Sequence, residues 1–165
     1  MTVLENVLTG RHFYYRSGVI ANFFATRRSQ AEENQNKDYI LDLLNFLNLE
    51  SFKDRKAVDL PFGIQKRVEL ARAMALNPKI LMLDEPAGGL NPQETENLMG
   101  LIQSIRDERG ISILLVEHDM RLVMGLSDRI CVLHFGQKIA EGTPKEIQQN
   151  KHVIEAYLGT TKHDA

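Results

Sequence analysis

The sequence has little cysteine and no long apolar run, and both absences narrow what the protein can be. A single cysteine, Cys131, cannot form a disulfide within the chain, which excludes a small disulfide-stabilised secreted fold. It lies in an apolar run, where we expect it to be buried. No apolar stretch approaches the roughly 20 residues that a membrane-spanning helix needs, and the N-terminus lacks a secretory signal pattern.

The sequence also lacks an excess of charge of either sign. Its 20 basic and 22 acidic residues leave a formal net charge of −2, which gives no indication of a surface for nucleic acid or anionic lipid. Hydrophobic residues at 43% and charged residues at 25% are ordinary for a globular domain, and 165 residues suffice for one domain with a sizeable core. We therefore expect a cytoplasmic globular protein without a nucleic-acid partner.

Two carboxylates follow the strongest apolar run of the chain. Residues 80–83 are four large apolar side chains in succession, which is typical of a short strand buried on both faces. Asp84 and Glu85 come next, and Pro86 ends the strand. Because an unpaired carboxylate is costly to bury, such a pair indicates a bound cation or a proton-transfer role; the alternative is a polar strand end in solvent.

A histidine ends the second apolar run. Residues 111–116 predict another strand, which leaves the core at Glu117, His118 and Asp119. A helix separates the two strands: Asn91 and Glu94 are typical of its start, and Gly110 of its end. Strand, helix and strand in this order predict a parallel sheet covered by helices, in which the carboxyl ends of neighbouring strands share a rim.

Other segments show helical or hairpin patterns. Helices are predicted at residues 3–8, with Thr2 as cap, at 39–47 and at 68–75; strands at 129–134 and 138–141 predict a hairpin near Gly136. Aromatic residues alternate with arginines within residues 13–28, which is typical of a surface for a protein or nucleic-acid partner. Aromatic side chains in the core and arginines in solvent would give the same pattern.

Residues 60–65 precede the helix at 68–75 and contain a glycine where a ligand would approach. Gly63 allows a close approach of the backbone, and the N-terminus of the following helix attracts anions. The simpler interpretation is a turn before a helix.

In their order, these residues resemble the ATP-binding subunit of an ABC transporter. Residues 60–65 resemble the signature motif, residues 80–85 the Walker B strand, residues 87–91 the D-loop, and His118 the switch histidine. Residues 84–92, 116–120 and 139–144 are similar to those of branched-chain amino acid importers, and urea and amide importers are nearly as similar. The resemblance extends from Met1 to about Gly159.

The resemblance implies an α/β fold, a partial P-loop NTPase domain of the ABC ATPase type. It implies a parallel sheet covered by helices, together with the end of the helical subdomain. Residues 1–76 would be part of the helical signature subdomain. Residues 77–165 would be the C-terminal part of the ATPase core.

The resemblance also implies a role for each candidate residue. Asp84 would hold Mg²⁺ through water, Glu85 would orient or deprotonate the attacking water, and His118 would contact the γ-phosphate of ATP. The other implied nucleotide-binding positions are Leu60, Pro61, Phe62, Gly63, Ile64, Gln65, Gly89 and Asn91. The implied partners are a transmembrane permease and a second ATP-binding subunit, in a homo- or heterodimer at the inner face of the cell membrane.

The chain departs from the family pattern in two places. Pro61 stands where the Leu-Ser-Gly-Gly-Gln form has serine, so the hydroxyl and the N–H are lost, and Phe62 and Ile64 replace a glycine and the glutamine. None of the 11 glycines is followed by lysine, so the sequence contains no Gly-x-x-x-x-Gly-Lys-Ser/Thr loop to cradle the β- and γ-phosphates. We expect these residues alone to bind ATP poorly and not to hydrolyse it.

Part of the strand surface is predicted to lack a cover. The usual sheet of the family has further strands, without which we expect Leu81, Leu83, Leu114 and Val116 to be partly uncovered and open to association.

The preferred interpretation is the energy-coupling ATP-binding subunit of a branched-chain amino acid importer, present as a fragment without the phosphate loop. A different class is a non-catalytic interaction or regulatory remnant that pairs with an intact ABC subunit. A third is an ABC-type ATPase of DNA repair or chromosome architecture; the near-neutral charge and the lack of coiled-coil heptads argue against it.

Overall fold

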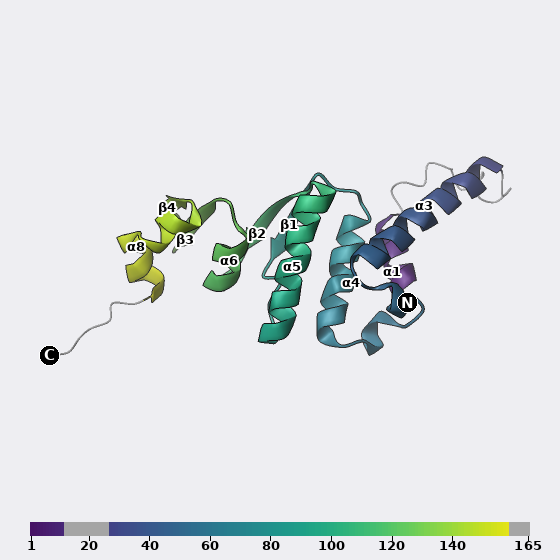
Figure 1. The fold of residues 1–165 in the computed structure, drawn as a ribbon, viewed down its shortest axis with the longest axis horizontal. Coiled ribbons are helices and arrows are strands. Elements are labelled where there is room, and N and C mark those ends of the chain that lie inside the picture. Colours follow the sequence, from purple (N-terminus) through teal and green to yellow (C-terminus); the bar gives the residue numbers. More distant parts are fainter. Residues whose placement is uncertain (12–26, 159–165) are drawn as a thin grey trace. The chain divides into compact units, whose positions relative to one another are not determined.

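The computed structural model describes residues 1–11 and 27–158 (Figure 1). The chain divides into two compact units, Met1–Leu114 and Leu115–Ala165. The aromatic–arginine pattern lies mostly at residues 12–26, outside the described residues, so its interpretation as a surface for a partner stays a prediction.

The first unit begins with helices that pack on one another: α1 (Val3–Gly10), α3 (Arg27–Phe46) and α4 (Phe62–Met74) (Figure 1). α1 starts at the predicted cap, since the Thr2 hydroxyl accepts from the Glu5 N–H and the Glu5 carboxylate accepts from the Thr2 N–H. The short 3₁₀ turns η2 (Glu50–Phe52) and η3 (Ala57–Asp59) connect α3 to α4. The predicted apolar face of α3 is buried, with the side chains of Ile40, Leu43 and Leu44 in the core, and so is Leu47 directly after the helix.

Arg11 joins the three helices at one end. Its Nε donates to Asn36 Oδ1 at 2.9 Å, and its NH1 donates to the Ala75 carbonyl at 3.2 Å. The guanidinium carbon also lies 4.1 Å from the centroid of the Tyr39 ring. Asn36 is buried, so this partner removes most of the cost of taking its amide out of water.

The strand–helix–strand order predicted from the sequence is confirmed. β1 (Ile80–Asp84) is followed by α5 (Pro92–Arg109) and β2 (Ser112–Val116), and the two strands are neighbours in a two-stranded parallel sheet. α5 begins with the predicted capping box, in which Asn91 and Glu94 each accept the other's backbone N–H. It ends at Gly110, whose φ of 63° lies in the left-handed region that favours glycine.

β1 is not buried on both faces, which corrects the sequence prediction. Leu81 is buried, whereas Ile80 and Met82 are 63% and 73% exposed. Leu114 and Val116 are uncovered as predicted; the same expectation for Leu81 is wrong, and Leu83 is half-buried. Alternate residues of a strand point to opposite faces, so Leu81 lies on the covered face and its two neighbours on the open one.

We expect this open apolar face to cause self-association of the purified chain. A contiguous exposed patch of large apolar side chains favours association in water. Met82→Lys places a charge on the open face without disturbing the core and should shift the chain toward the monomer in light scattering after gel filtration. Val58→Lys is the matched control, because Val58 is 76% exposed in η3. A wild-type chain that is already monomeric would contradict the prediction.

The second unit contains α6 (Met120–Leu126), β3 (Ile130–His134), β4 (Gln137–Gly142), α7 (Pro144–Gln148), α8 (Lys151–Val153) and η4 (Ile154–Leu158). β3 and β4 form the predicted antiparallel hairpin, which turns at Phe135 and Gly136, both with positive φ. Its core consists of Ile130, Val132, Ala140, Ile147 and Val153. Cys131 points to the other side of β3 and is exposed, so the expectation that it is buried is wrong.

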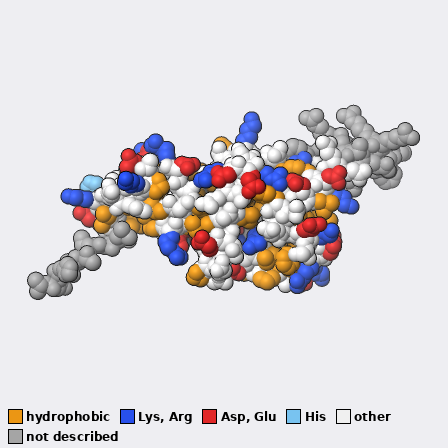
Figure 2. All heavy atoms as spheres, viewed as in Figure 1, with side chains coloured by type: hydrophobic (Ala, Val, Ile, Leu, Met, Phe, Trp, Pro, Cys, Tyr) orange, Lys and Arg blue, Asp and Glu red, His pale blue; other side chains and the backbone are white. Residues whose placement is uncertain are grey.

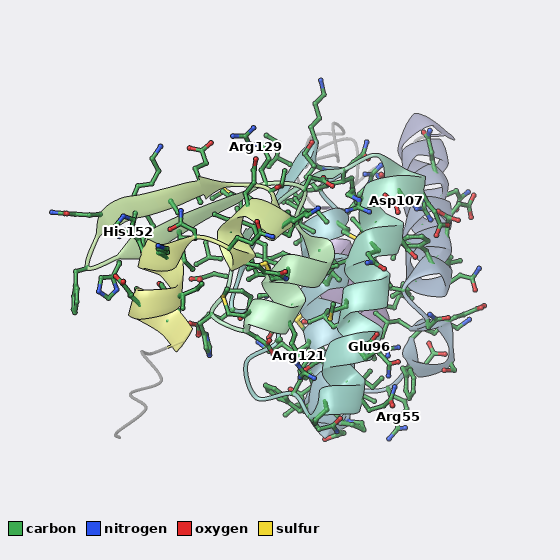
Figure 3. The ribbon with its side chains drawn as sticks, turned by 60° about the vertical axis from the view of Figure 1, so that its left-hand side comes forward. Arg55, Glu96, Asp107, Arg121, Arg129 and His152 are labelled. Atoms are coloured by element: carbon green, nitrogen blue, oxygen red, sulfur yellow. The ribbon has the colours of Figure 1, made fainter. Side chains whose placement is uncertain are left out.

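On the face shown in Figure 2, basic and acidic side chains of the described residues lie among one another. On the hairpin, the Glu141 carboxylate accepts from Lys138 Nζ at 2.9 Å and from Arg129 at 3.0 Å. Arg129 is labelled in Figure 3. These two cations, Lys138 first, hold the pKa of Glu141 below its usual range.

Within the described residues, no helix has the length and apolar character needed to cross a membrane.

Candidate functional site

Asp84 and Glu85 lie at the carboxyl end of β1, where the sequence places them, and both are exposed. Glu85 has a φ of 44°, in the left-handed region, which costs a residue with a side chain about 1–3 kcal/mol. The chain then turns: the Gly88 N–H donates to the Glu85 carbonyl at 3.0 Å. Asn48, Asn77 and Phe135 share this positive φ, and the role of Glu85 stays a prediction from the sequence.

The signature-like segment, residues 60–65, forms the entry to α4. Pro61 is the N-cap residue and offers no side-chain cap, and its carbonyl accepts from the Ile64 and Gln65 N–H groups at 2.9 and 3.0 Å. The Gln65 side-chain amide donates to the Leu60 carbonyl at 2.8 Å. The side chain of Gln65 therefore stabilises the segment itself.

The structure brings the signature-like segment against the D-loop-like segment, residues 87–91. A Cβ at Gly89 would lie 3.0 Å from Phe62 Cε1, so the aromatic ring sits directly against this glycine. A Cβ at Gly63 would lie 2.7 Å from Glu94 Oε1, and the other oxygen of Glu94 accepts from the Asn91 N–H. The predicted nucleotide-binding positions Phe62, Gly63, Gly89 and Asn91 thus belong to one packed cluster.

Sequence reasoning missed this packing. It placed Phe62 among the implied nucleotide-binding positions, but it did not predict the contact of Phe62 with Gly89 and did not include Glu94 in the site. A large aromatic residue in place of one glycine, with glycines in a second loop, is the signal that would have indicated the contact.

Gly89→Ala is expected to lower the free energy of unfolding by about 1–3 kcal/mol, because Gly89 has a φ of 80° and an added Cβ would lie 3.0 Å from the Phe62 ring, which must then shift. Adding Phe62→Ala to Gly89→Ala removes the close contact between the new Cβ and the ring. The free-energy cost of the positive φ at residue 89 remains. The double variant should therefore lose less stability than the sum of the two single variants in urea unfolding. Simple additivity would show that the ring and the glycine do not interact.

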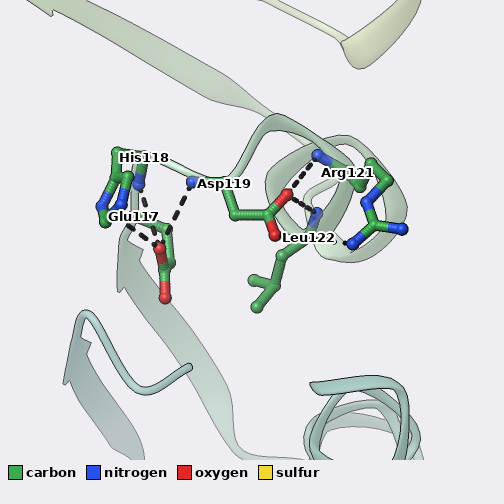
Figure 4. Close-up of polar contacts among 5 residues, drawn as sticks. All are labelled: Glu117, His118, Asp119, Arg121 and Leu122. Atoms are coloured by element: carbon green, nitrogen blue, oxygen red, sulfur yellow. Dashed lines mark hydrogen bonds and ion pairs between the residues drawn. The ribbon is translucent and has the colours of Figure 1, made fainter. Parts of the chain in front are cut away.

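In the second unit, the turn from β2 into α6 presents His118 to solvent (Figure 4). The His118 side chain is 75% exposed, whereas the Glu117 side chain is 2% exposed. Glu117 Oε2 accepts from the His118 N–H at 3.0 Å and from the Asp119 N–H at 3.4 Å. The same oxygen lies 3.8 Å from His118 Nδ1.

Asp119 caps the helix that follows. Its Oδ1 accepts from the Arg121 N–H at 2.8 Å and from the Leu122 N–H at 3.4 Å (Figure 4). Two carboxylates therefore hold the backbone on either side of His118, and the imidazole is the group that the turn exposes. That His118 shares a rim with Asp84 and Glu85 stays a prediction from the sequence.

The side chains near Asp84 can be tested for their fit to a metal ion. The described residues contain no group of three His, Cys, Asp or Glu side chains that would make an all-protein metal site. An exposed carboxylate such as Asp84 instead fits Mg²⁺, which keeps several waters and is held by one or two carboxylates together with substrate phosphates.

A groove of about 420 Å³ in the first unit contains none of the predicted site residues. It lies between the end of α3, α4 and α5, and its lining is Phe46, Asn48, Arg67, Asn97, Gly100, Leu101, Ser104 and Glu108. The candidate chemistry lies at the ends of strands and helices rather than in a closed pocket.

Sequence comparison decides the family. The ABC transporter profile matches residues 4–88, about half of the chain. The chain belongs to the ABC transporter family. A second profile, that of the branched-chain amino acid ATP-binding cassette transporter, matches residues 137–163.

Its relatives in the ABC transporter family include two named for branched-chain amino acid transport. BraF, a high-affinity branched-chain amino acid transport ATP-binding protein of Pseudomonas aeruginosa, is 45% identical over 159 residues, covering 96% of this chain and 62% of BraF. LivG of Escherichia coli K12, which carries the same description, is 44% identical with the same coverage. The chain thus spans about three fifths of the length of these curated relatives.

A solved ABC cassette confirms the predicted fold class. The ADP conformation of MJ1267, an ATP-binding cassette of an ABC transporter, is 32% identical with a TM-score of 0.77, and the match covers 96% of this chain and 63% of that one. The fold is therefore that of an ABC ATPase, a P-loop NTPase, of which this chain contains part.

Proposed function

We propose that the chain is part of the ATP-binding, energy-coupling subunit of an importer for branched-chain amino acids. The observation that carries this proposal is the 45% identity to BraF over 96% of the chain. The branched-chain amino acid profile at residues 137–163 favours this substrate class over urea and amides.

In this proposal, residues 1–76 belong to the helical signature subdomain and residues 77–165 to the ATPase core. Asp84 would hold Mg²⁺, which would supply positive charge against the phosphates. Glu85 orients the attacking water and accepts its proton, and His118 contacts the γ-phosphate. The packed cluster of the two segments holds the backbone near Gly63 and Gly89 for contact with ATP bound to a second subunit.

The proposed partners are a transmembrane permease and a second ATP-binding subunit, at the inner face of the cell membrane. This assignment is supported by a relative that is itself part of a complex. The cbiO1 protein of Clostridium perfringens, described as part of the ABC transporter complex cbiONQ, is 34% identical with a TM-score of 0.68 over 74% of this chain and 49% of that one.

A chimera tests the proposal. This chain would replace the matching part of BraF, and leucine uptake would be measured in cells without BraF. We expect the chimera to co-purify with its permease and to restore uptake. A chimera that assembles with the permease and does not transport leucine would contradict the assignment.

The second candidate is a non-catalytic module that pairs with an intact ATP-binding subunit. We expect the purified chain to release no phosphate from ATP, and to co-purify with intact BraF if it is such a module. Phosphate release that Glu85→Gln abolishes in the purified chain would exclude this candidate.

A further inference from the structure

We infer that Glu117 is a positioning residue for His118, an inference that rests on the proposed function for the role of His118. Glu117 follows the last residue of β2, and its side chain is 2% exposed beside a histidine side chain that is 75% exposed. A single oxygen of this carboxylate, Oε2, makes three contacts. It accepts from the backbone N–H groups of His118 and Asp119, and it lies near Nδ1 of the His118 ring.

The burial of the Glu117 carboxylate has a desolvation cost, which indicates a specific role for this side chain. Taking a carboxylate out of water costs several kcal/mol unless hydrogen bonds and charges compensate. The side chains of β2 alternate between half-buried and exposed positions, so a leucine or valine would continue the pattern without that cost. A buried glutamate instead supplies a charged acceptor for backbone N–H groups, which a leucine or valine cannot.

The contacts define what Glu117 does. Its Oε2 fixes the His118 N–H at 3.0 Å and the Asp119 N–H at 3.4 Å, so the backbone on both sides of the His118 Cα is held. The same atom lies 3.8 Å from His118 Nδ1, so this edge of the ring faces the Glu117 carboxylate. Asp119 performs a different task, since its carboxylate accepts from the first turn of α6.

Nuclear magnetic resonance of the 165-residue chain tests the inference without requiring ATP turnover. In Glu117→Ala, amide hydrogen exchange at His118 and Asp119 should become about 10- to 100-fold faster, the loss expected for a hydrogen bond to a charged group. In Glu117→Gln, the side-chain oxygen still accepts, so the acceleration should be smaller, while the loss of charge should shift the Nδ1 resonance of His118. Asp119→Ala is the matched control: it should loosen the start of α6 and leave the His118 amide protected.

Two results would overturn the inference: unchanged His118 exchange and ring resonances in both Glu117 variants, or equal changes in Asp119→Ala. If Glu117→Ala does not fold, an unchanged Nδ1 resonance in Glu117→Gln decides against it. The role of His118 itself is tested separately, by adding Mg²⁺ and ATP to the BraF chimera with a labelled imidazole. An unperturbed ring there would count against the proposed phosphate contact and leave the Glu117 result standing.

Discussion

Glu85→Gln is expected to lower ATP turnover by the assembled BraF chimera about 100- to 10,000-fold, the range typical for loss of a general base. Glutamine has nearly the same shape, so nucleotide binding should persist while the group that accepts the proton of the attacking water is lost. Glu85 stands directly after β1 in a left-handed conformation, which holds its carboxylate at the strand end. Phosphate release from membranes that contain the assembled transporter measures the effect.

Two further variants make this test specific. Glu96→Gln removes an exposed carboxylate of α5 and should leave turnover unchanged (Figure 3). Glu85→Gly relieves the positive φ, so it should abolish turnover without lowering the melting temperature. Turnover within a few fold of the parent in Glu85→Gln would remove Glu85 from the catalytic step.

Local chemistry explains why so much of the fold could be predicted from the sequence. The start of α5 depends on Asn91 and Glu94, and its end on Gly110, and each acts within one turn of its own position. Burial could not be predicted in the same way. A run of four apolar residues indicates a strand, but whether Ile80 and Met82 are covered depends on which other parts of a protein lie against them.

In the candidate site, too, local features could be predicted from the sequence and tertiary contacts could not. The order of motifs places Asp84 and His118 at strand ends, because strand ends can be read from apolar runs. The contact of Phe62 with Gly89 joins segments on opposite sides of β1, and no periodicity reveals it. The burial of the Glu117 side chain could not be predicted either. A glutamate next to a histidine in the sequence indicates two exposed side chains, and only the three-dimensional structure of the turn shows that Glu117 is buried.

Gly10→Ala is expected to lower the free energy of unfolding of the first unit by about 2–3 kcal/mol, at the upper end of the cost of overpacking. Gly10 ends α1, where a Cβ would collide with the backbone carbonyl of Arg72 in α4 and lie 3.2 Å from the Ala75 Cβ. A backbone carbonyl inside a helix cannot turn away as a flexible side chain would, so α1 and α4 must separate. Urea unfolding followed by helical circular dichroism measures the loss.

Gly100→Ala is the matched control, because the same change is made in a helix where a Cβ at Gly100 would meet nothing within 4 Å. Alanine there should stabilise α5 by about 0.5–1 kcal/mol through its better helix propensity. The two substitutions should thus have opposite signs, although both replace a helical glycine by alanine. Equal effects would mean that propensity alone acts and that α1 does not pack against α4 as closely as the geometry indicates.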